Sequence, residues 1–303
     1  IQAQSETGFD QTLTIVPLGV FPDANADVIY GFGPPNALVN LSIENSDAYG
    51  FVPTGPDGAF AVAMDQLQVT SGGDLVAGQW VRLCAADADG NHVCTAASTP
   101  AVILRTSMDG QNDVFGDSAI PGNDILITVT HPVSDIIATA ATTAGTGWSG
   151  PRSYYAPLDR GILTPGVSVA VDFGDGIVET VDLVEITGEA DIDSNRVTGK
   201  APADSIVRVV ARDPWGTEVS LDSVPVDSTG AYEADFDTIG WDIQPGGSFS
   251  VYLPLERGHQ IEYAFWLPRA EVRVEKEQTP GIAVPGGTYL YKIRLWNDGD
   301  GDA

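Results

Sequence analysis

The chain has 303 residues with 42 acidic and 14 basic side chains, so its formal net charge at pH 7 is −28. Such a charge repels phosphate backbones, which excludes nucleic acid as a partner. Hydrophobic residues make up 43% of the chain, enough for buried cores. No apolar run reaches the roughly 18 residues of a membrane-spanning helix, so we expect no membrane insertion.

Short β-strands separated by Gly, Pro, Asn and Asp follow one another along the chain, and almost no stretch has a helical apolar period. Many short strands without intervening helices favour antiparallel β-sandwiches. We therefore predict an all-β fold. The predicted strands, in chain order, are 12–16, 38–43, 125–129, 167–173, 206–211, 248–253 and 288–296.

An internal repeat organises these strands. A strand, a Pro-containing turn and a second strand occur at 27–41, 113–127 and 196–209, and later in each copy a Gly turn precedes another strand. The glycines of these later turns lie about 80 to 90 residues apart, the size of an immunoglobulin-like sandwich. We predict tandem immunoglobulin-like antiparallel β-sandwiches, with an N-terminal strand segment at 1–26, modules at 27–105, 106–186 and 187–268, and a partial fourth β module at 269–303.

The third module carries a recognisable set of turns. A glycine and a proline precede an apolar strand within 197–209, and an Asp-x-x-Gly-x-aromatic turn follows at 226–232. With these motifs it resembles the bacterial immunoglobulin-like domains of large extracellular proteins. Residues 56–60 repeat the turn in the first module, whereas the second module has no clear copy. The tail is similar to the opening of another surface-protein repeat, with a Pro-Gly turn, a Thr-Tyr strand and an Asn-x-Gly turn within 284–299.

The resemblance implies a secreted or cell-surface protein with a structural or adhesive role. An accessory carbohydrate- or protein-binding module of a large secreted enzyme is the alternative function. The implied partners are other copies of the chain or surface polymers.

The two ends suggest a piece of a longer protein, because the chain starts without Met or a signal peptide and stops after an acidic run. We expect residues 11–20 to form a strand outside the first module, and 269–303 to supply only part of a sandwich. Either further residues complete the fourth module in the same molecule, or a neighbouring copy covers its edges. Repeated head to tail, the second arrangement would build a filament or surface layer.

Two cysteines give the clearest local signal. Cys84 and Cys94 flank a turn centred on Asp89, which places them opposite each other on one face of a hairpin. We predict a disulfide and an oxidising compartment. Two free thiols or a metal pair are the alternatives, although no Cys or His quartet accompanies them.

Acidic turns are candidate calcium sites, because alternating carboxylates on tight turns supply hard oxygen ligands. None has a complete EF-hand loop, and Asp-Gly pairs also simply make hairpin turns. Calcium is therefore an optional cofactor here. The candidate ligands are Asp87, Asp89, Asn91, Asp172, Asp175, Asp191, Asp193, Asn195, Asp298, Asp300 and Asp302.

No arrangement for catalysis is apparent. The three histidines, His92, His131 and His259, lie in separate places, and no nucleophile, phosphate-loop or zinc-helix motif occurs. We therefore predict that the chain is not an enzyme.

A Gly/Ser/Thr-rich stretch contains Trp148, Tyr154 and Tyr155. If exposed together, these aromatic residues would form a ligand-binding surface. Alternatively, Trp148 closes one end of a sandwich and the two tyrosines belong to a strand.

Overall fold

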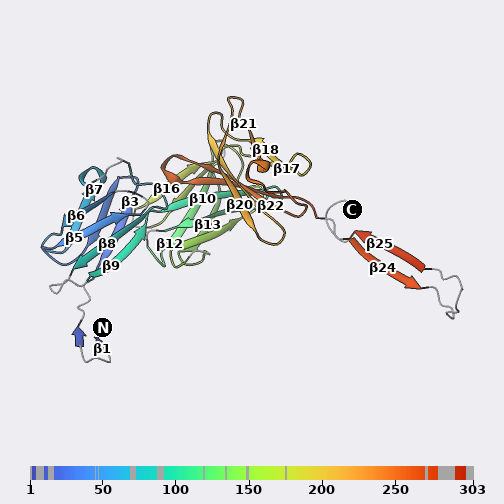
Figure 1. Cartoon of the computed structure of the whole chain (residues 1–303). Helices are drawn as coiled ribbons and strands as arrows, with labels where there is room; N and C mark the ends of the chain where they lie inside the picture. Colours follow the sequence, from blue (N-terminus) through green and yellow to red (C-terminus); the bar gives the residue numbers. More distant parts are fainter. Residues whose placement is uncertain are drawn as a thin grey trace. The chain divides into compact units, whose positions relative to one another are not determined.

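A computed structural model of the chain describes residues 2–4, 10–12, 17–44, 46, 48–68, 73–86, 92–118, 120–133, 135–147, 150–174, 176–269, 272–278 and 291–297. The chain divides into two compact units. The first comprises Ile1–Thr106, Gly110–Val184 and Pro254–Ile261, and the second comprises Ser107–Asp109, Glu185–Leu253 and Glu262–Ala303. Antiparallel strands dominate both, so the predicted all-β class is confirmed (Figure 1). Helix within the described residues is limited to the short turns Met64–Gln66 (η1), Phe236–Ile239 (η2) and Glu256–Gly258 (η3).

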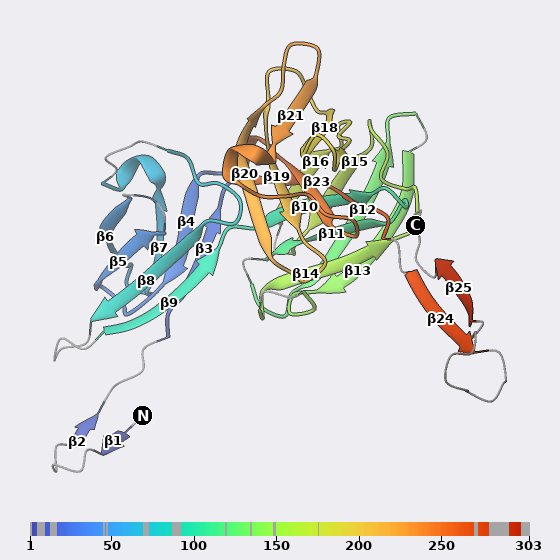
Figure 2. The same ribbon diagram turned by 45° about the vertical axis from the view of Figure 1, so that its right-hand side comes forward.

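The first sandwich lies in the first unit and pairs a three-stranded sheet, β3-β4-β7, with a four-stranded sheet, β6-β5-β8-β9 (Figure 2). Its strands are Gly19–Asp23 (β3), Val28–Phe32 (β4), Leu38–Ile43 (β5), Tyr49–Pro53 (β6), Ala59–Ala63 (β7), Trp80–Ala86 (β8) and His92–Ser98 (β9). Alternation sets the buried face. In β5, the side chains of Val39 and Leu41 are fully buried, whereas the side chain of Leu38 is exposed on the outer face of the sheet.

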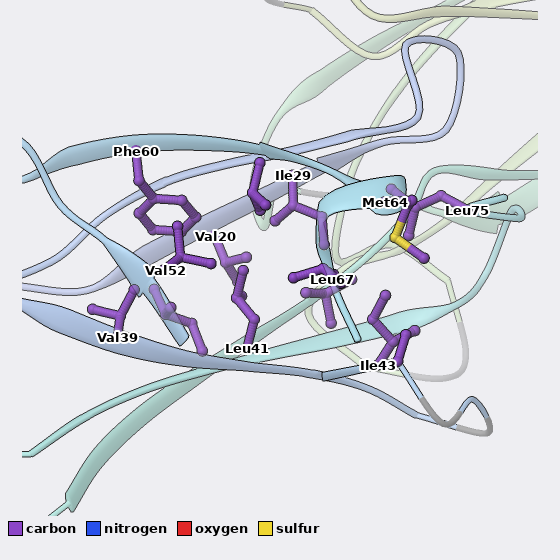
Figure 3. Close-up of a cluster of buried hydrophobic side chains, with 14 of the residues drawn as sticks. Val20, Ile29, Val39, Leu41, Ile43, Val52, Phe60, Met64, Leu67 and Leu75 are labelled. Carbon is purple, nitrogen blue, oxygen red and sulfur yellow. The ribbon is translucent and has the colours of Figure 1, made fainter. Parts of the chain in front are cut away.

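The core of this sandwich forms where the two sheets face each other (Figure 3). Ile29 of β4 and Phe60 of β7 extend from one sheet, and Leu41 of β5 and Val52 of β6 from the other. Met64 of η1 belongs to the same cluster. Burial of these apolar side chains is the main favourable contribution to the stability of the sandwich.

The second sandwich, also in the first unit, pairs strands in the order β14-β11-β10, which are part of a seven-stranded sheet, with the four-stranded sheet β13-β12-β15-β16. Its strands are Ala101–Ser107 (β10), Asn112–Asp117 (β11), Asp124–His131 (β12), Asp135–Thr143 (β13), Ser153–Leu158 (β14), Ser168–Asp172 (β15) and Val178–Asp182 (β16). Val129 and Val169 are directly opposite each other on β12 and β15, and both are fully buried. This pairing places the β-branched residues of the predicted strands in the core.

The third sandwich pairs the three-stranded sheet β17-β18-β21 with a second layer of strands in the order β23-β22-β19-β20. Its strands are Glu189–Asp191 (β17), Arg196–Lys200 (β18), Ile206–Arg212 (β19), Glu218–Pro225 (β20), Ala231–Asp235 (β21), Ser248–Pro254 (β22) and Gln260–Trp266 (β23). Val209 pairs with Val251 across β19 and β22, and both are fully buried. Most of this sandwich belongs to the second unit.

The three sandwiches share one strand connectivity. In each, the first, second and fifth strands are neighbours in one sheet, and the fourth, third, sixth and seventh are neighbours in the other, in that order. The strands also shift two of the predicted boundaries. β3 pairs with β4, so the first sandwich begins before residue 27, and β10 pairs with β11, so residue 105 lies inside the second sandwich.

A glycine facing an aromatic residue recurs in all three sandwiches. The second strand of each carries a glycine that is paired with an aromatic residue on the fifth strand; the pairs are Gly31 with Phe60, Gly116 with Tyr154, and Gly199 with Tyr232. A Cβ added to any of the three glycines would lie within 2.5 Å of a carbonyl oxygen of the first strand or the residues before it. Only glycine therefore allows this close approach.

In the second and third sandwiches the aromatic residue is also a hydrogen-bond donor. The Tyr154 hydroxyl donates to the Ala101 carbonyl at 3.0 Å, and the Tyr232 hydroxyl donates to the Thr187 carbonyl at 2.7 Å. Burial raises the pKa of both phenols above the ordinary tyrosine value. Tyr154 thus supplies the second module with the aromatic position that the sequence did not identify there.

Two hairpins complete the described chain. Gln2–Gln4 (β1) pairs with Asp10–Thr12 (β2), and Val272–Gln278 (β24) pairs with Tyr291–Asn297 (β25). In the second hairpin Val274 is opposite Leu295, and both are exposed. The predicted strand at 12–16 overlaps β2 only at Thr12, because residues 13–16 lie outside the described residues.

Candidate functional site

A disulfide joins Cys84 of β8 to Cys94 of β9. The two residues are directly paired in the ladder, with their Cα atoms 4.1 Å apart, and the Arg82 guanidinium donates to Cys94 Sγ at 3.6 Å. The bond fastens the edge strand β9 to its neighbour and closes a hairpin loop of about a dozen residues. It is a structural crosslink on the outer side of the first sandwich.

The acidic turn at 191–195 uses its oxygens internally. The Asp191 carboxylate accepts hydrogen bonds from the backbone amides of Asp193 and Ser194, at 2.9 and 3.4 Å, and from the Ser194 hydroxyl at 2.8 Å. These bonds, with the Ser194 hydroxyl first, lower the pKa of Asp191. They form a hairpin turn closed by its own aspartate.

Asn195 is committed to a structural role. Its amide nitrogen donates to Asp237 Oδ1 at 2.7 Å and to the Trp241 carbonyl at 2.6 Å, and its oxygen accepts from the Ile243 amide at 2.8 Å. The residue is 8% exposed and has a φ of 54°, a conformation that asparagine tolerates better than most residues. Its amide nitrogen therefore holds η2 and the segment after it, and its oxygen is bonded to the backbone amide of Ile243.

The other predicted calcium ligands do not form a site within the described part of the chain. Asp172 Oδ1 accepts from the Gly174 amide at 2.8 Å, as in a hairpin turn. No group of three or more His, Cys, Asp or Glu side chains in the described ranges could hold a metal ion. Asp87, Asp89, Asn91, Asp175, Asp298, Asp300 and Asp302 lie outside the described residues.

The tyrosines of the predicted aromatic surface lie on a strand. Tyr154 is 1% exposed and packs edge-on against Phe173, with ring centroids 5.5 Å apart. Tyr155 faces the other way and donates from its hydroxyl to Asp113 Oδ1 at 2.7 Å. Trp148 lies outside the described residues. Consecutive residues of a strand point to opposite faces of the sheet, and the side chain of Tyr154 points into the core. Tyr154 therefore cannot contribute to an exposed ligand-binding surface.

The three histidines remain apart. His92 is exposed at the start of β9, and His131 Nδ1 accepts from the Val133 amide at 3.2 Å at the end of β12. His259 is different because it is 5% exposed and contacts a buried carboxylate, Glu179, which is 2% exposed. Both side chains of this pair are therefore almost fully buried.

The Glu179 carboxylate binds three side chains from two segments of the first unit. Asn25, in the turn between β3 and β4, donates to Glu179 Oε1 at 2.8 Å. His259 Nε2 lies 3.2 Å from Glu179 Oε2, and the Arg257 guanidinium lies 3.7 Å from the same oxygen. A buried carboxylate requires such partners, since the desolvated charge is otherwise costly.

Sequence reasoning did not single out Glu179. It occupies an inward position of β16, whose residues alternate between exposed and buried. A carboxylate at a core position of an alternating strand is the one signal that could have identified it. His259, 80 residues away, could not have been paired with it from the sequence.

A second polar contact joins the two sandwiches of the first unit. The guanidinium of Arg152, which precedes β14, lies over the Trp80 ring with its Cζ 5.7 Å from the ring centroid. It also donates to the Ala96 carbonyl of β9. Partial burial lowers the pKa of Arg152, and Asp117 acts in the opposite direction. Arg152 therefore contacts β8 and β9 of the first sandwich from the second.

The third sandwich has an open hollow of about 790 Å³ over β18 and β21. Its lining includes Thr198, Lys200, Glu233 and Tyr232, and contains neither histidine nor cysteine. Tyr232 is already bonded to Thr187.

No known protein family and no curated protein matches the chain. Among solved structures it is similar to a tetra-tandem repeat in the extending region of a large adhesion protein, with 16% identity, a TM-score of 0.22, and 94% of this chain and 89% of that chain covered. It is also similar to a 1.5-MDa bacterial ice-binding adhesin studied for host cell surface retention, with 12% identity, a TM-score of 0.21, and coverage of 84% and 97%.

A third similar structure is a Ca²⁺-stabilised adhesin with which an Antarctic bacterium binds ice, with 14% identity, a TM-score of 0.18, and coverage of 85% and 76%. With TM-scores this low the superposition over the whole chain is poor, so these three structures establish neither the fold nor the function of the chain. None of the helices in the described ranges is long and apolar enough to cross a membrane.

Proposed function

We propose that the chain is a structural or adhesive segment of a secreted or cell-surface protein, built from tandem immunoglobulin-like modules that space other parts of that protein. The observation that carries the proposal is the repetition of one seven-strand connectivity in three sandwiches. Three copies of one architecture, without a grouped catalytic or metal-binding set in the described residues, favour a mechanical role.

The proposed modules correspond to the strands at 19–98, 101–182 and 189–266, preceded by an N-terminal segment and followed by part of a fourth module at 269–303. The immunoglobulin-like assignment is supported by the division of seven antiparallel strands between two facing sheets. The Gly–aromatic pair found in each sandwich supports a common origin of the modules. No enzymatic activity is part of this proposal.

A secreted or surface location is supported by the disulfide, since such bonds persist in oxidising compartments. The net charge of −28 favours a hydrated surface that resists non-specific association. Calcium is an optional cofactor of the proposal, limited to the turns at 87–91, 172–175 and 298–302.

We extend the proposal to assembly with other copies of the chain. The hairpin of β24 and β25 exposes Val274, Ile293 and Leu295 by 60%, 62% and 68%, and a two-stranded sheet is marginally stable alone. Coverage by a strand of another copy would explain this apolar face. Sedimentation at rising protein concentration tests this, and a monomer at every concentration, unchanged by Leu295→Glu, would count against end-to-end assembly.

A binding module is the second candidate function. Tyr49 and Phe51 are 50% and 67% exposed on the outer side of β6, and exposed aromatic residues are typical of ligand-binding surfaces. Retardation of the chain in gels containing a polysaccharide, lost in Tyr49→Ala and Phe51→Ala, would favour this function over the structural one.

The proposed function is tested on intact cells of the native source. Antibodies raised against the chain should label these cells without permeabilisation. Labelling that requires permeabilisation, together with free thiols at Cys84 and Cys94 in the native protein, would contradict it.

A further inference from the structure

A short segment from late in the chain is built into the first unit. Residues 254–261 connect β22 to β23 and belong to the first unit by their contacts. The segment forms a tight turn in which the Leu255 amide donates to the His259 carbonyl at 2.8 Å and the Gly258 amide to the Leu255 carbonyl at 3.2 Å. Arg257 and Gly258 both have positive φ angles, 68° and 84°.

One side of this turn is fitted against the first sandwich. The Ala77 amide, just before β8, donates to the Arg257 carbonyl at 2.5 Å. A Cβ added to Gly258 would lie 2.8 Å from the Ala77 oxygen and 2.9 Å from its nitrogen, closer than real Cβ contacts. Gly258 is therefore required both for the turn and for the contact with the first sandwich.

The other side of the turn is fitted against the second sandwich. The Val102 amide of β10 donates to His259 Nδ1 at 3.3 Å. A backbone amide can only donate, so Nδ1 is the acceptor and Nε2 carries the hydrogen that points to Glu179 Oε2 at 3.2 Å. Ile261, at the end of the segment, is fully buried.

Glu179 closes the arrangement, because its second oxygen accepts from Asn25 of the first sandwich. One buried carboxylate thus receives donors from the first sandwich and from residues 254–261 while lying on a strand of the second. Removing the Asn25 donor leaves the buried Glu179 Oε1 without this hydrogen bond.

We propose that residues 254–261 are a clasp that makes the first two sandwiches one cooperative folding unit, with Glu179 as the shared hydrogen-bond acceptor. The inference is independent of the location or partners of the protein. It also means that the first unit is complete only after the chain has extended roughly 70 residues beyond β16, so its final stability is acquired late in synthesis.

Site-resolved hydrogen exchange of the full chain tests the clasp. In the natural protein, core amides of β5 and β12 should exchange through one opening event with equal protection. Gly258→Ala and Glu179→Gln should separate them, lowering protection in one sandwich by roughly 100-fold more than in the other. Glu256→Gln, at an exposed position of the same segment, is the control and should change neither.

Asn25→Ala removes only the donor from the first sandwich and replaces Gly258→Ala if that variant does not fold. It should separate β5 from β12 in the same direction. Unequal protection of β5 and β12 in the natural protein would overturn the proposal. Equal protection that persists in both Glu179→Gln and Asn25→Ala would overturn it as well.

Discussion

Replacing Gly199 by alanine tests whether the Gly–aromatic pair determines the packing of a sandwich. A Cβ at this position would lie 2.1 Å from the Thr187 carbonyl oxygen and 2.5 Å from the Tyr232 hydroxyl. The backbone before β17 must then move by about 1 Å, and overpacking of this kind costs about 1–3 kcal/mol. Displacing Tyr232 also breaks its bond to Thr187, worth about 1 kcal/mol.

The expected destabilisation is therefore about 2–4 kcal/mol. For a sandwich of about 80 residues, 1 kcal/mol shifts the melting temperature by roughly 4–8 °C, so the transition of the third sandwich should fall by about 10 °C or more. Differential scanning calorimetry measures this. Thr198→Ala, exposed on the same strand, is the control and should shift the transition by about 2 °C or less. Equal melting of the two variants would refute the steric role of Gly199.

Three further predictions concern the crosslink, the acidic turns and the buried phenols. Cys84 and Cys94 should resist alkylation in the native protein, and reduction should cost the first sandwich about 2–3 kcal/mol; two alkylated thiols before reduction would be inconsistent with the structure. Chelator should leave the melting of the third sandwich unchanged, because the Asp191 turn is satisfied by its own backbone; a lower melting temperature would instead indicate a bound ion. Burial raises the folded-state pKa of Tyr154 and Tyr232, so stability is complete below the unfolded pKa of about 10 and is lost as pH rises above it. An alkaline absorbance titration should show these two phenols ionising only on unfolding, and full ionisation of all tyrosines near pH 10 without loss of structure would contradict this.

Local patterns predicted the strands well. The predicted strand at 38–43 coincides with β5, because Val39, Leu41 and Ile43 alternate with residues on the outer face. These features depend on residues close together in the sequence, which is why a single sequence contains them.

Pairing between distant strands was not accessible in the same way. β10 is not among the strands predicted from the sequence, and β3 overlaps the predicted strand at 11–20 only at its first two residues. Which sandwich each of the two strands joins depends on the ladders with β4 and β11. The contact between Glu179 and His259 spans 80 residues and unites segments with no shared pattern. The hydrogen bonds of Asp191 show the related difficulty that the carboxylate of an acidic turn can accept from backbone amides of its own turn.

Pulling single full-length molecules from both ends tests the proposed architecture most directly. Each sandwich of about 80 residues should release roughly 25 nm of chain when it unfolds. The account predicts discrete steps of about 25 nm, or about 50 nm where the clasp makes the first two sandwiches unfold together, with a total near 75 nm. Smooth extension without steps, or steps of unrelated length, would contradict it.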